Sequence, residues 1–274
     1  MPALASGSNV LNYRIDGGDD DLPLLVLSNG LGLDLGMWEP QMPALAREFR
    51  VLRYDTRGHG GSSPAPSAFA IADLGRDVLA LLDHLGADRM HFCGFSMGGI
   101  IGIWLGIHAP RRLDKLVLAH TAACIGPQAM WNERMAIVSA RGMQAISDAA
   151  MRRWFTAGFV EDQPGIVGAL KTSMERNSPL GYVQCCAAIR DADYRDQVAR
   201  IHTPTLVVSG VQDVATTPAD ARFLAQSIAG AQAVEIDSAH LSNFEKPQEF
   251  TAALRGFLSA TGVSNRIARL ASAR

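Results

Sequence analysis

Ser96 is the residue whose surroundings most clearly suggest chemistry. It lies in Gly94-Phe95-Ser96-Met97-Gly98, which fits the pattern G-x-S-x-G. This pattern is typical of a nucleophilic serine held on a strained turn between a strand and a helix, with its hydroxyl exposed. Such a turn brings backbone segments into contact where a Cβ would collide, which explains the glycine on either side. A glycine-rich turn with an incidental serine would look the same, so the prediction depends on partners elsewhere in the chain.

Two further residues are placed to act with Ser96. Asp213 comes shortly after the apolar run 204–210, and His240 comes shortly after the run 233–236. Both runs are expected to be strands, and the carboxyl ends of parallel strands meet at one edge of a sheet, where a carboxylate and an imidazole can reach a serine. The chain order Ser96, Asp213, His240 is that of an α/β-hydrolase. We therefore predict a triad in which Ser96 is the nucleophile, His240 the base and Asp213 the partner of that base.

Two loops that follow earlier strands contribute to the same site. The loop 28–32 contains two glycines and leaves the apolar run 22–27. In serine hydrolases such a loop can turn a backbone N–H toward the oxyanion, and Leu31 N–H is our candidate donor, although a plain turn would have the same sequence. The polar loop 55–63 contains a second histidine, His59. We expect Arg57 and His59 to brace this loop, because His240 is better placed to act as the base.

The elements that position these residues alternate along the chain. Apolar runs predict strands at residues 10–15, 22–27, 50–54, 90–93, 113–119, 204–210 and 233–236, and helical spacing or length predicts helices near 37–49, 74–85, 100–107 and 224–228. Asp16-Gly17-Gly18-Asp19 predicts a hairpin turn after the first strand. Because continuous apolar runs are typical of strands buried on both faces, we predict an α/β fold with a mostly parallel central sheet and helices on both faces.

Residues 121–199 interrupt this alternation, because they contain short helical patterns and no clear strand. An inserted helical cap over the strand ends is the simplest interpretation, since ligands of open α/β sheets bind there. The predicted organisation is a hydrolase core at 1–120 and 200–262, a cap at 121–199 and a C-terminal tail at 263–274, which we expect to be solvated.

The predicted cap offers candidate substrate-binding residues. Trp131 and Arg134 are three positions apart and share one face of a helix, so an indole and a guanidinium could hold a small unsaturated acid. Trp154 lies on another apolar face of the cap, and we expect it to contact the substrate as well. Equally simply, Trp131 could pack within the cap and Arg134 could be solvated, without either residue binding substrate.

Composition limits the possible partners. The formal net charge is −2 and 48% of the residues are apolar, so the chain can bury a large core but offers no field that would attract nucleic acid. No apolar run approaches the roughly 18 residues of a membrane span, and residues 1–10 lack the pattern of a signal peptide. Four cysteines, without C-x-x-C spacing, are expected to be reduced thiols. We predict a cytoplasmic protein without nucleic-acid or membrane partners.

The sequence resembles the 3-oxoadipate enol-lactonases of the α/β-hydrolase superfamily, nearly from end to end. The elbow and the Arg57-Gly58-His59-Gly60 loop are shared by many hydrolases, whereas the cap segments and His240-Leu241-Ser242-Asn243 are narrower marks of this family. The other resembling segments are residues 27–32, 37–38, 53–60, 153–156, 181–182, 185–191 and 239–243. Two positions depart from the family pattern: Gly30 replaces an expected small hydroxyl residue, and Phe95 replaces an expected leucine.

This resemblance implies the activity and completes the site. It implies hydrolysis of 3-oxoadipate enol-lactone to 3-oxoadipate in the β-ketoadipate pathway of aromatic degradation, through a serine acyl-enzyme and without a metal or organic cofactor. It also implies that Met97 N–H joins Leu31 N–H in the oxyanion hole. A broader carboxylesterase or lactonase and a carbon–carbon bond hydrolase with the same triad remain alternatives, as does a non-catalytic ligand receptor of this fold. The sequence leaves the oligomeric state open.

Overall fold

A single sheet organises the structure. The computed structural model describes residues 2–6, 9–17 and 21–260 of the 274-residue chain. Within these residues eight strands are arranged in the order β1-β2-β4-β3-β5-β6-β7-β8. Strand β2 is antiparallel to both of its neighbours, whereas all pairings from β4 to β8 are parallel. The strands are β1 (Ala3–Ser6), β2 (Asn9–Asp16), β3 (Leu24–Ser28), β4 (Arg50–Tyr54), β5 (Met90–Phe95), β6 (Leu113–Ala119), β7 (Thr205–Gly210) and β8 (Gln232–Ile236).

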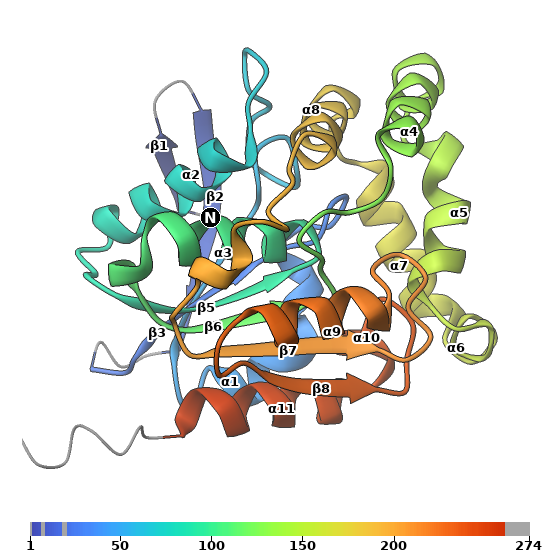
Figure 1. Ribbon diagram of the computed structural model, residues 1–274. Coiled ribbons are helices and arrows are strands. Elements are labelled where there is room, and N and C mark those ends of the chain that lie inside the picture. Colours follow the sequence, from blue (N-terminus) through green and yellow to red (C-terminus); the bar gives the residue numbers. More distant parts are fainter. Residues whose placement is uncertain (1, 7–8, 18–20, 261–274) are drawn as a thin grey trace, which may run out of the picture.

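Helices cover both faces of this sheet. In Figure 1, α1 (Met42–Leu45) and α11 (Pro247–Ser259) lie below the sheet, and α2 (Ile71–His84), α3 (Met97–His108) and α9 (Pro218–Ser227) lie above it. Because both faces are covered, every residue of β3, β5 and β7 is buried, as expected for central strands of a parallel sheet. The predicted fold class is therefore confirmed.

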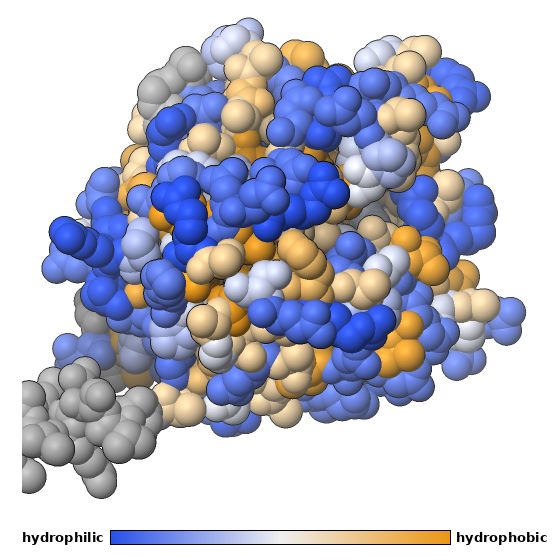
Figure 2. All heavy atoms as spheres, viewed as in Figure 1, coloured by the Kyte–Doolittle hydropathy of each residue, from blue (hydrophilic) through white to orange (hydrophobic). Residues whose placement is uncertain are grey.

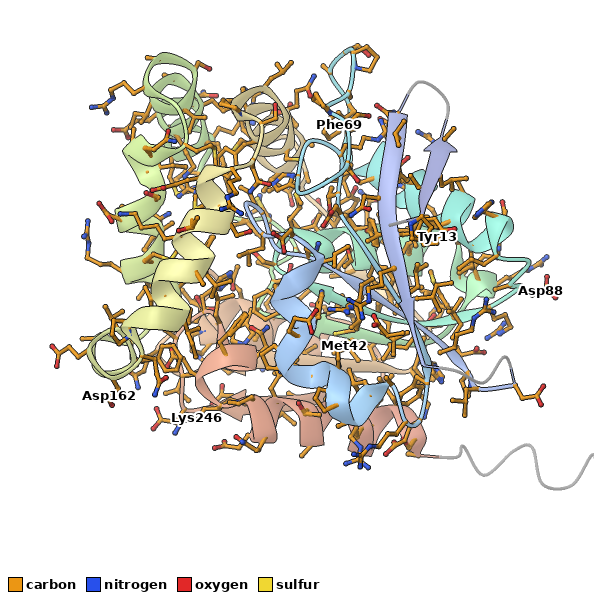
Figure 3. All side chains as sticks on the ribbon, turned by 180° about the vertical axis from the view of Figure 1, so that it is seen from behind. Tyr13, Met42, Phe69, Asp88, Asp162 and Lys246 are labelled. Atoms are coloured by element: carbon orange, nitrogen blue, oxygen red, sulfur yellow. The ribbon has the colours of Figure 1, made fainter. Side chains whose placement is uncertain are left out.

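Five helices form a separate group between β6 and β7, and we call them the cap helices. In Figure 3, Asp162 at the end of α6 marks the outer margin of this group, and Asp88, in the loop before β5, lies at the opposite margin of the molecule. The cap helices are α4 (Gln128–Arg141), α5 (Gln144–Trp154), α6 (Ala157–Asp162), α7 (Pro164–Glu175) and α8 (Pro179–Arg190). The division into a core and a cap domain stays a prediction, and the predicted tail at 263–274 lies outside the described residues.

Three local predictions differ from the structure. The hairpin predicted at residues 16–19 is wrong, because β3 pairs with β4 and β5 rather than with β2. Instead, β2 pairs with β1, which the sequence analysis missed. The helix predicted near 37–49 is replaced by a 3-10 helix, η1 (Leu35–Gln41), and the single turn α1. Pro40 lies inside η1 and Pro43 in the first turn of α1, and proline lacks the N–H that a continuous α-helix requires.

The remaining elements are short. They are the 3-10 helices η2 (Pro110–Arg112) and η3 (Val198–Arg200), and the single turn α10 (Ser242–Glu245), which follows His240. Hydrophilic residues cover most of the face drawn in Figure 2, with smaller hydrophobic areas between them. Within the described part of the chain, each helix is too short or too polar to cross a lipid bilayer. The four cysteines are free thiols, as predicted.

Candidate active site

The elbow that carries Ser96 joins β5 to α3. Ser96 has a φ of 54°, in the left-handed region that non-glycine residues rarely adopt, at a cost on the order of 1–3 kcal/mol. A Cβ on Gly94 would lie 2.0 Å from the carbonyl oxygen of Gly98, and a Cβ on Gly98 would lie 2.3 Å from that of Ser28. The predicted reason for these glycines is confirmed. The Ser96 backbone is fixed further, because its N–H donates to Ala119 O at 2.9 Å.

Asp213 and His240 meet at the carboxyl edge of the sheet. His240 Nδ1–H donates to Asp213 Oδ2 at 2.7 Å, and both side chains are buried. His240 lines the same pocket as Ser96. Because Nδ1 donates to the carboxylate, Nε2 is the nitrogen that remains to accept a proton. Among the described residues no hydrogen bond joins the Ser96 hydroxyl to the His240 ring. Catalytic hydrogen bonds of this kind commonly tighten when the substrate binds.

Asp213 is held in its ionised form. Burial acts to raise the pKa of its carboxyl, but the neighbouring His240 and the hydrogen bonds from both His240 and His120 outweigh it, and the pKa lies well below its ordinary value. The backbone N–H groups of Ala215 and Thr216 donate to Oδ1 at 2.8 and 3.0 Å, and the Thr216 hydroxyl donates to Oδ2 at 3.0 Å. The carboxylate therefore accepts hydrogen bonds from every side and has little freedom to turn.

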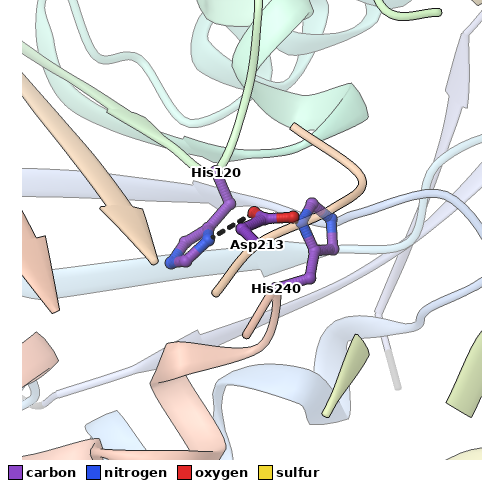
Figure 4. A group of neighbouring side chains, drawn as sticks. All are labelled: His120, Asp213 and His240. Carbon is purple, nitrogen blue, oxygen red and sulfur yellow. Dashed lines mark hydrogen bonds and ion pairs between the residues drawn. The ribbon is translucent and has the colours of Figure 1, made fainter. Parts of the chain in front are cut away.

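The sequence analysis missed His120, which also contacts Asp213. Its Nδ1 lies 3.0 Å from Asp213 Oδ2, and its ring is fully buried. Ligating atoms of His120, Asp213 and His240 lie within 4.8 Å of one another (Figure 4), and a hydrogen bond joins each imidazole to the carboxylate. His120 follows β6 directly, so the rule that identified Asp213 and His240 could have found it.

Two backbone N–H groups are candidates for binding an oxyanion: that of Met97, which follows Ser96 in the chain, and that of Leu31, which lines the same pocket as Ser96. Within the described residues, the N–H groups of Leu31 and Met97 donate to no protein acceptor. Met97 is the first residue of α3, where backbone N–H groups have no partner within the helix. Leu31 belongs to the loop that leaves β3 and lines the pocket. Two such donors next to a nucleophile suit the binding of an oxyanion.

His59 is hydrogen-bonded to the loop that contains Leu31. Its Nε2 accepts a hydrogen bond from Gly32 N–H at 2.9 Å, and its Nδ1–H donates to Arg57 O at 3.1 Å. Arg57 in turn forms an ion pair with Asp77 of α2. Burial lowers the pKa of His59 to about 4, against the opposing effect of the Arg57 carbonyl, so the ring is neutral at pH 7. These contacts are those expected of bracing residues.

A pocket of about 540 Å³ lies between the strand ends and the cap helices. Ser96, His240 and Leu31 line it from the side of the sheet, and the three residues predicted to bind substrate line it from the side of the cap. These are Trp131 and Arg134 of α4 and Trp154 of α5. The pocket therefore brings together the predicted nucleophile, base and substrate-binding side chains.

The cap side of the pocket carries two positive charges. The Arg134 guanidinium lies 4.8 Å from the centre of the Trp131 ring, and the Trp131 indole N–H donates to Ile125 O at 2.6 Å. Arg153 also lines the pocket, and burial followed by the charge of Arg134 lowers its pKa. Among the described residues neither guanidinium has a carboxylate partner. The sequence analysis did not identify Arg153 as a pocket residue, because no local pattern shows which way its side chain points.

The two departures from the family pattern lie beside Ser96. A Cβ on Gly30 would have ordinary contacts, including one of 3.6 Å with the Ser96 Cβ, so glycine leaves extra space there. The Phe95 ring is fully buried, stacks on His120 with the ring centres 4.9 Å apart, and contacts His240 edge to face at 5.5 Å. Phe95 thus packs against both imidazoles.

The comparisons with known proteins agree on one family. Residues 23–142 match the model of the alpha/beta hydrolase fold family. The chain is 43% identical to 3-oxoadipate enol-lactonase 2 of Acinetobacter baylyi, over 90% of this chain and 92% of that protein. The crystal structure of the enol-lactonase from Burkholderia xenovorans LB400 superimposes with a TM-score of 0.93 at 44% identity, over 94% of this chain and 100% of that one. An esterase from Thermogutta terrifontis follows at 26% identity and a TM-score of 0.86, over 94% and 96% of the two chains.

Proposed function

The chain belongs to the 3-oxoadipate enol-lactonase family of the α/β-hydrolases, and from that premise we propose that it hydrolyses 3-oxoadipate enol-lactone to 3-oxoadipate. The reaction is a step of aromatic degradation by the β-ketoadipate pathway. The observation that carries this proposal is a single pocket that holds a strained serine, a buried histidine with its carboxylate, and two unneutralised arginines. Ester hydrolysis needs the first two features, and an anionic substrate needs the third.

In the proposed mechanism, Ser96 attacks the lactone carbonyl while His240 Nε2 accepts the hydroxyl proton. Asp213 keeps the Nδ1–H tautomer of His240 and stabilises the cation that forms. A bond forms between Oγ and the carbonyl carbon, and the displaced electron pair collects on the carbonyl oxygen. The N–H groups of Leu31 and Met97 then stabilise this oxyanion, and one such donor typically contributes roughly a hundred- to a thousandfold in rate.

Collapse of this intermediate breaks the bond to the ring oxygen. The electron pair leaves with that oxygen as an enol, which takes the proton from His240 and later becomes a ketone. Water then gives a proton to His240 and attacks the acyl-enzyme, and the second collapse returns the Ser96 hydroxyl and releases a second carboxylate. Each proton moves through Nε2 of the same imidazole, and water is the only co-reactant.

The cap helices are proposed to select the substrate. The enol-lactone carries one carboxylate, and we assign its binding to Arg134 and Arg153, because a guanidinium without a protein carboxylate is available for a bidentate ion pair. Trp131 lies against Arg134, and Trp154 lines the wall beside it, so both limit where the lactone ring can lie. The free cysteines are consistent with a reducing compartment, and we place the reaction in the cytoplasm.

A broader carboxylesterase activity is the second candidate. The pocket volume of about 540 Å³ falls within the range of pockets that hold drug-sized ligands, and Gly30 leaves additional space next to Ser96. Both observations permit esters larger than the enol-lactone.

A substrate panel tests these proposals. The purified protein is assayed with the enol-lactone, with neutral aryl and alkyl esters, and with ring-fission diketones, and Ser96→Ala serves as the control for background hydrolysis. We expect the highest kcat/KM for the enol-lactone. A neutral ester with equal or higher kcat/KM would favour the carboxylesterase, and turnover of a diketone alone would favour a carbon–carbon bond hydrolase.

A further inference from the structure

His120 is a buried histidine that contacts Asp213 but is not a member of the triad. Its Nδ1–H donates to Asp213 Oδ2 at 3.0 Å, and its Nε2 lies 2.6 Å from the Ser242 hydroxyl. An ionised carboxylate only accepts hydrogen bonds, so Nδ1 carries the proton and Nε2 accepts from Ser242 Oγ–H. Both ring nitrogens are therefore used, and the tautomer is fixed from both ends.

The oxygen that His120 contacts is the one that His240 uses. Asp213 Oδ2 receives the two imidazole N–H groups at 3.0 and 2.7 Å. A hydrogen bond to a carboxylate stabilises its charge and makes it a weaker partner for another cation. The hydrogen bond from neutral His120 therefore weakens the attraction between Asp213 and a protonated His240 ring.

The ring of His120 is rigidly held. Its backbone has a φ of 48°, and its N–H donates to Val208 O at 2.7 Å. One face of the ring stacks on Phe95, at an interplanar angle of 19°. Since Phe95 precedes the nucleophile, His120 connects the elbow strand to the carboxylate and to α10.

We propose that His120 is a positioning residue of the reaction: by donating to Asp213 Oδ2 it fixes the carboxylate and weakens its hold on protonated His240, so that the base stays unprotonated to lower pH. This inference rests on the proposed serine hydrolysis. It assigns to His120 a role through Asp213, not a contact with the substrate.

The charge state of His120 supports this role. Burial lowers its pKa, although the hydrogen bond and charge of Asp213 act to raise it, and the ring is neutral at pH 7. Among the described residues, the titratable groups that face it are Asp213, from the loop after β7, and His240, from the loop after β8. Its contacts with Phe95 of β5 and Ser242 of α10 are uncharged. A cation at His120 would oppose the imidazolium that forms on His240, with the ring centres 5.6 Å apart.

The test follows the rate at which a fluorophosphonate labels Ser96, as a function of pH. This reaction requires the activated serine but not the lactone, so it separates the two proposals: no labelling of the wild-type protein would overturn the serine mechanism itself. The variants are His120→Ala, which removes the donor, and His120→Asn, whose side-chain amide N–H replaces Nδ1–H and which tolerates positive φ. Ser242→Ala removes the hydroxyl that fixes the ring.

We expect the midpoint of the acidic limb to move upward by about half a pH unit or more in His120→Ala, since Asp213 then loses one of the two imidazole hydrogen bonds that share Oδ2 and binds protonated His240 more strongly. His120→Asn should return the midpoint to the wild-type value, and Ser242→Ala should shift it in the same direction by less. A midpoint that stays unchanged in His120→Ala, or that moves equally in His120→Asn, overturns the inference. If His120→Ala does not fold, the His120→Asn and Ser242→Ala profiles decide, and a Ser242→Ala midpoint equal to that of the wild type counts against it.

Discussion

The two sides of the pocket differ in how their polar groups are satisfied. On the sheet side, Asp213 accepts five hydrogen bonds, and His59 and His120 each use both ring nitrogens. On the cap side, Arg134 and Arg153 have no carboxylate partner within the described residues. A fully satisfied network fixes geometry, whereas an unneutralised charge retains its capacity to bind. The comparison indicates that the sheet side determines the chemistry and the cap side determines which substrate receives it.

Removal of the nucleophile is the most severe test of the sheet side. Ser96→Ala should lower kcat by about 10⁴-fold or more for the enol-lactone and for a neutral aryl ester alike, because the same oxygen attacks both carbonyls. Steady-state kinetics on the two substrates provide the measurement, and a thermal melt followed by circular dichroism serves as the control for folding. Retained hydrolysis of either substrate would mean that a different group attacks it.

The burial of His59 on the sheet side should make the stability of the folded protein depend on pH. The pKa of His59 is about 4 in the folded protein and 6.5 ordinarily, because burial disfavours the cation. Below pH 6.5 the unfolded chain binds a proton that the folded chain does not, so stability that is present above pH 6.5 is lost as the pH falls toward 4. The loss amounts to about 3 kcal/mol at pH 4.

Urea unfolding of the wild type and of His59→Gln between pH 7.5 and 4 measures this loss. The stability advantage of the wild type over the variant should shrink by about 3 kcal/mol across this range, because the contributions of Asp213 and the other groups cancel in the difference. His202→Gln, which changes an exposed histidine, is the matched control and should follow the wild-type curve. An advantage of the wild type that is constant with pH would contradict a neutral, buried His59.

The sequence predicted the sheet side better than the cap side, for physical reasons. Strands β4 and β6 were predicted to the residue, because each contains a run of β-favouring apolar residues that ends where the chain leaves the sheet. Strand β1, at Ala3–Ser6, is only four residues long, three of them small, and pairs with β2. Ser96, Asp213 and His240 each follow a strand, so topology brought them together, and His120 obeys the same rule.

Tertiary packing decided what the sequence could not. The orientation of Arg153 depends on how α5 packs beside α4, and helical spacing on α5 alone gives no sign of it. The same applies to Phe95, whose identity has a reason only once His120 and His240 are found on either side of it. The role of a residue that depends on local backbone geometry can therefore be predicted from the sequence. The role of a residue that depends on side-chain contacts between distant elements cannot.

The cap side gives the smallest effect and the one that depends most on the substrate. Arg153→Leu and Arg134→Leu should each raise KM for the anionic lactone by about tenfold to a hundredfold, since a hydrogen bond to a charged group is worth about 1.5–3 kcal/mol. KM for a neutral aryl ester and kcat for both substrates should change little, because the reacting atoms are held by the sheet side. Arg152→Leu, an exposed neighbour on α5, is the matched control and should leave all four constants unchanged. Equal losses on the charged and neutral substrates would mean that the arginines support the structure of the cap rather than bind a carboxylate, and the division of labour between the two sides would fail.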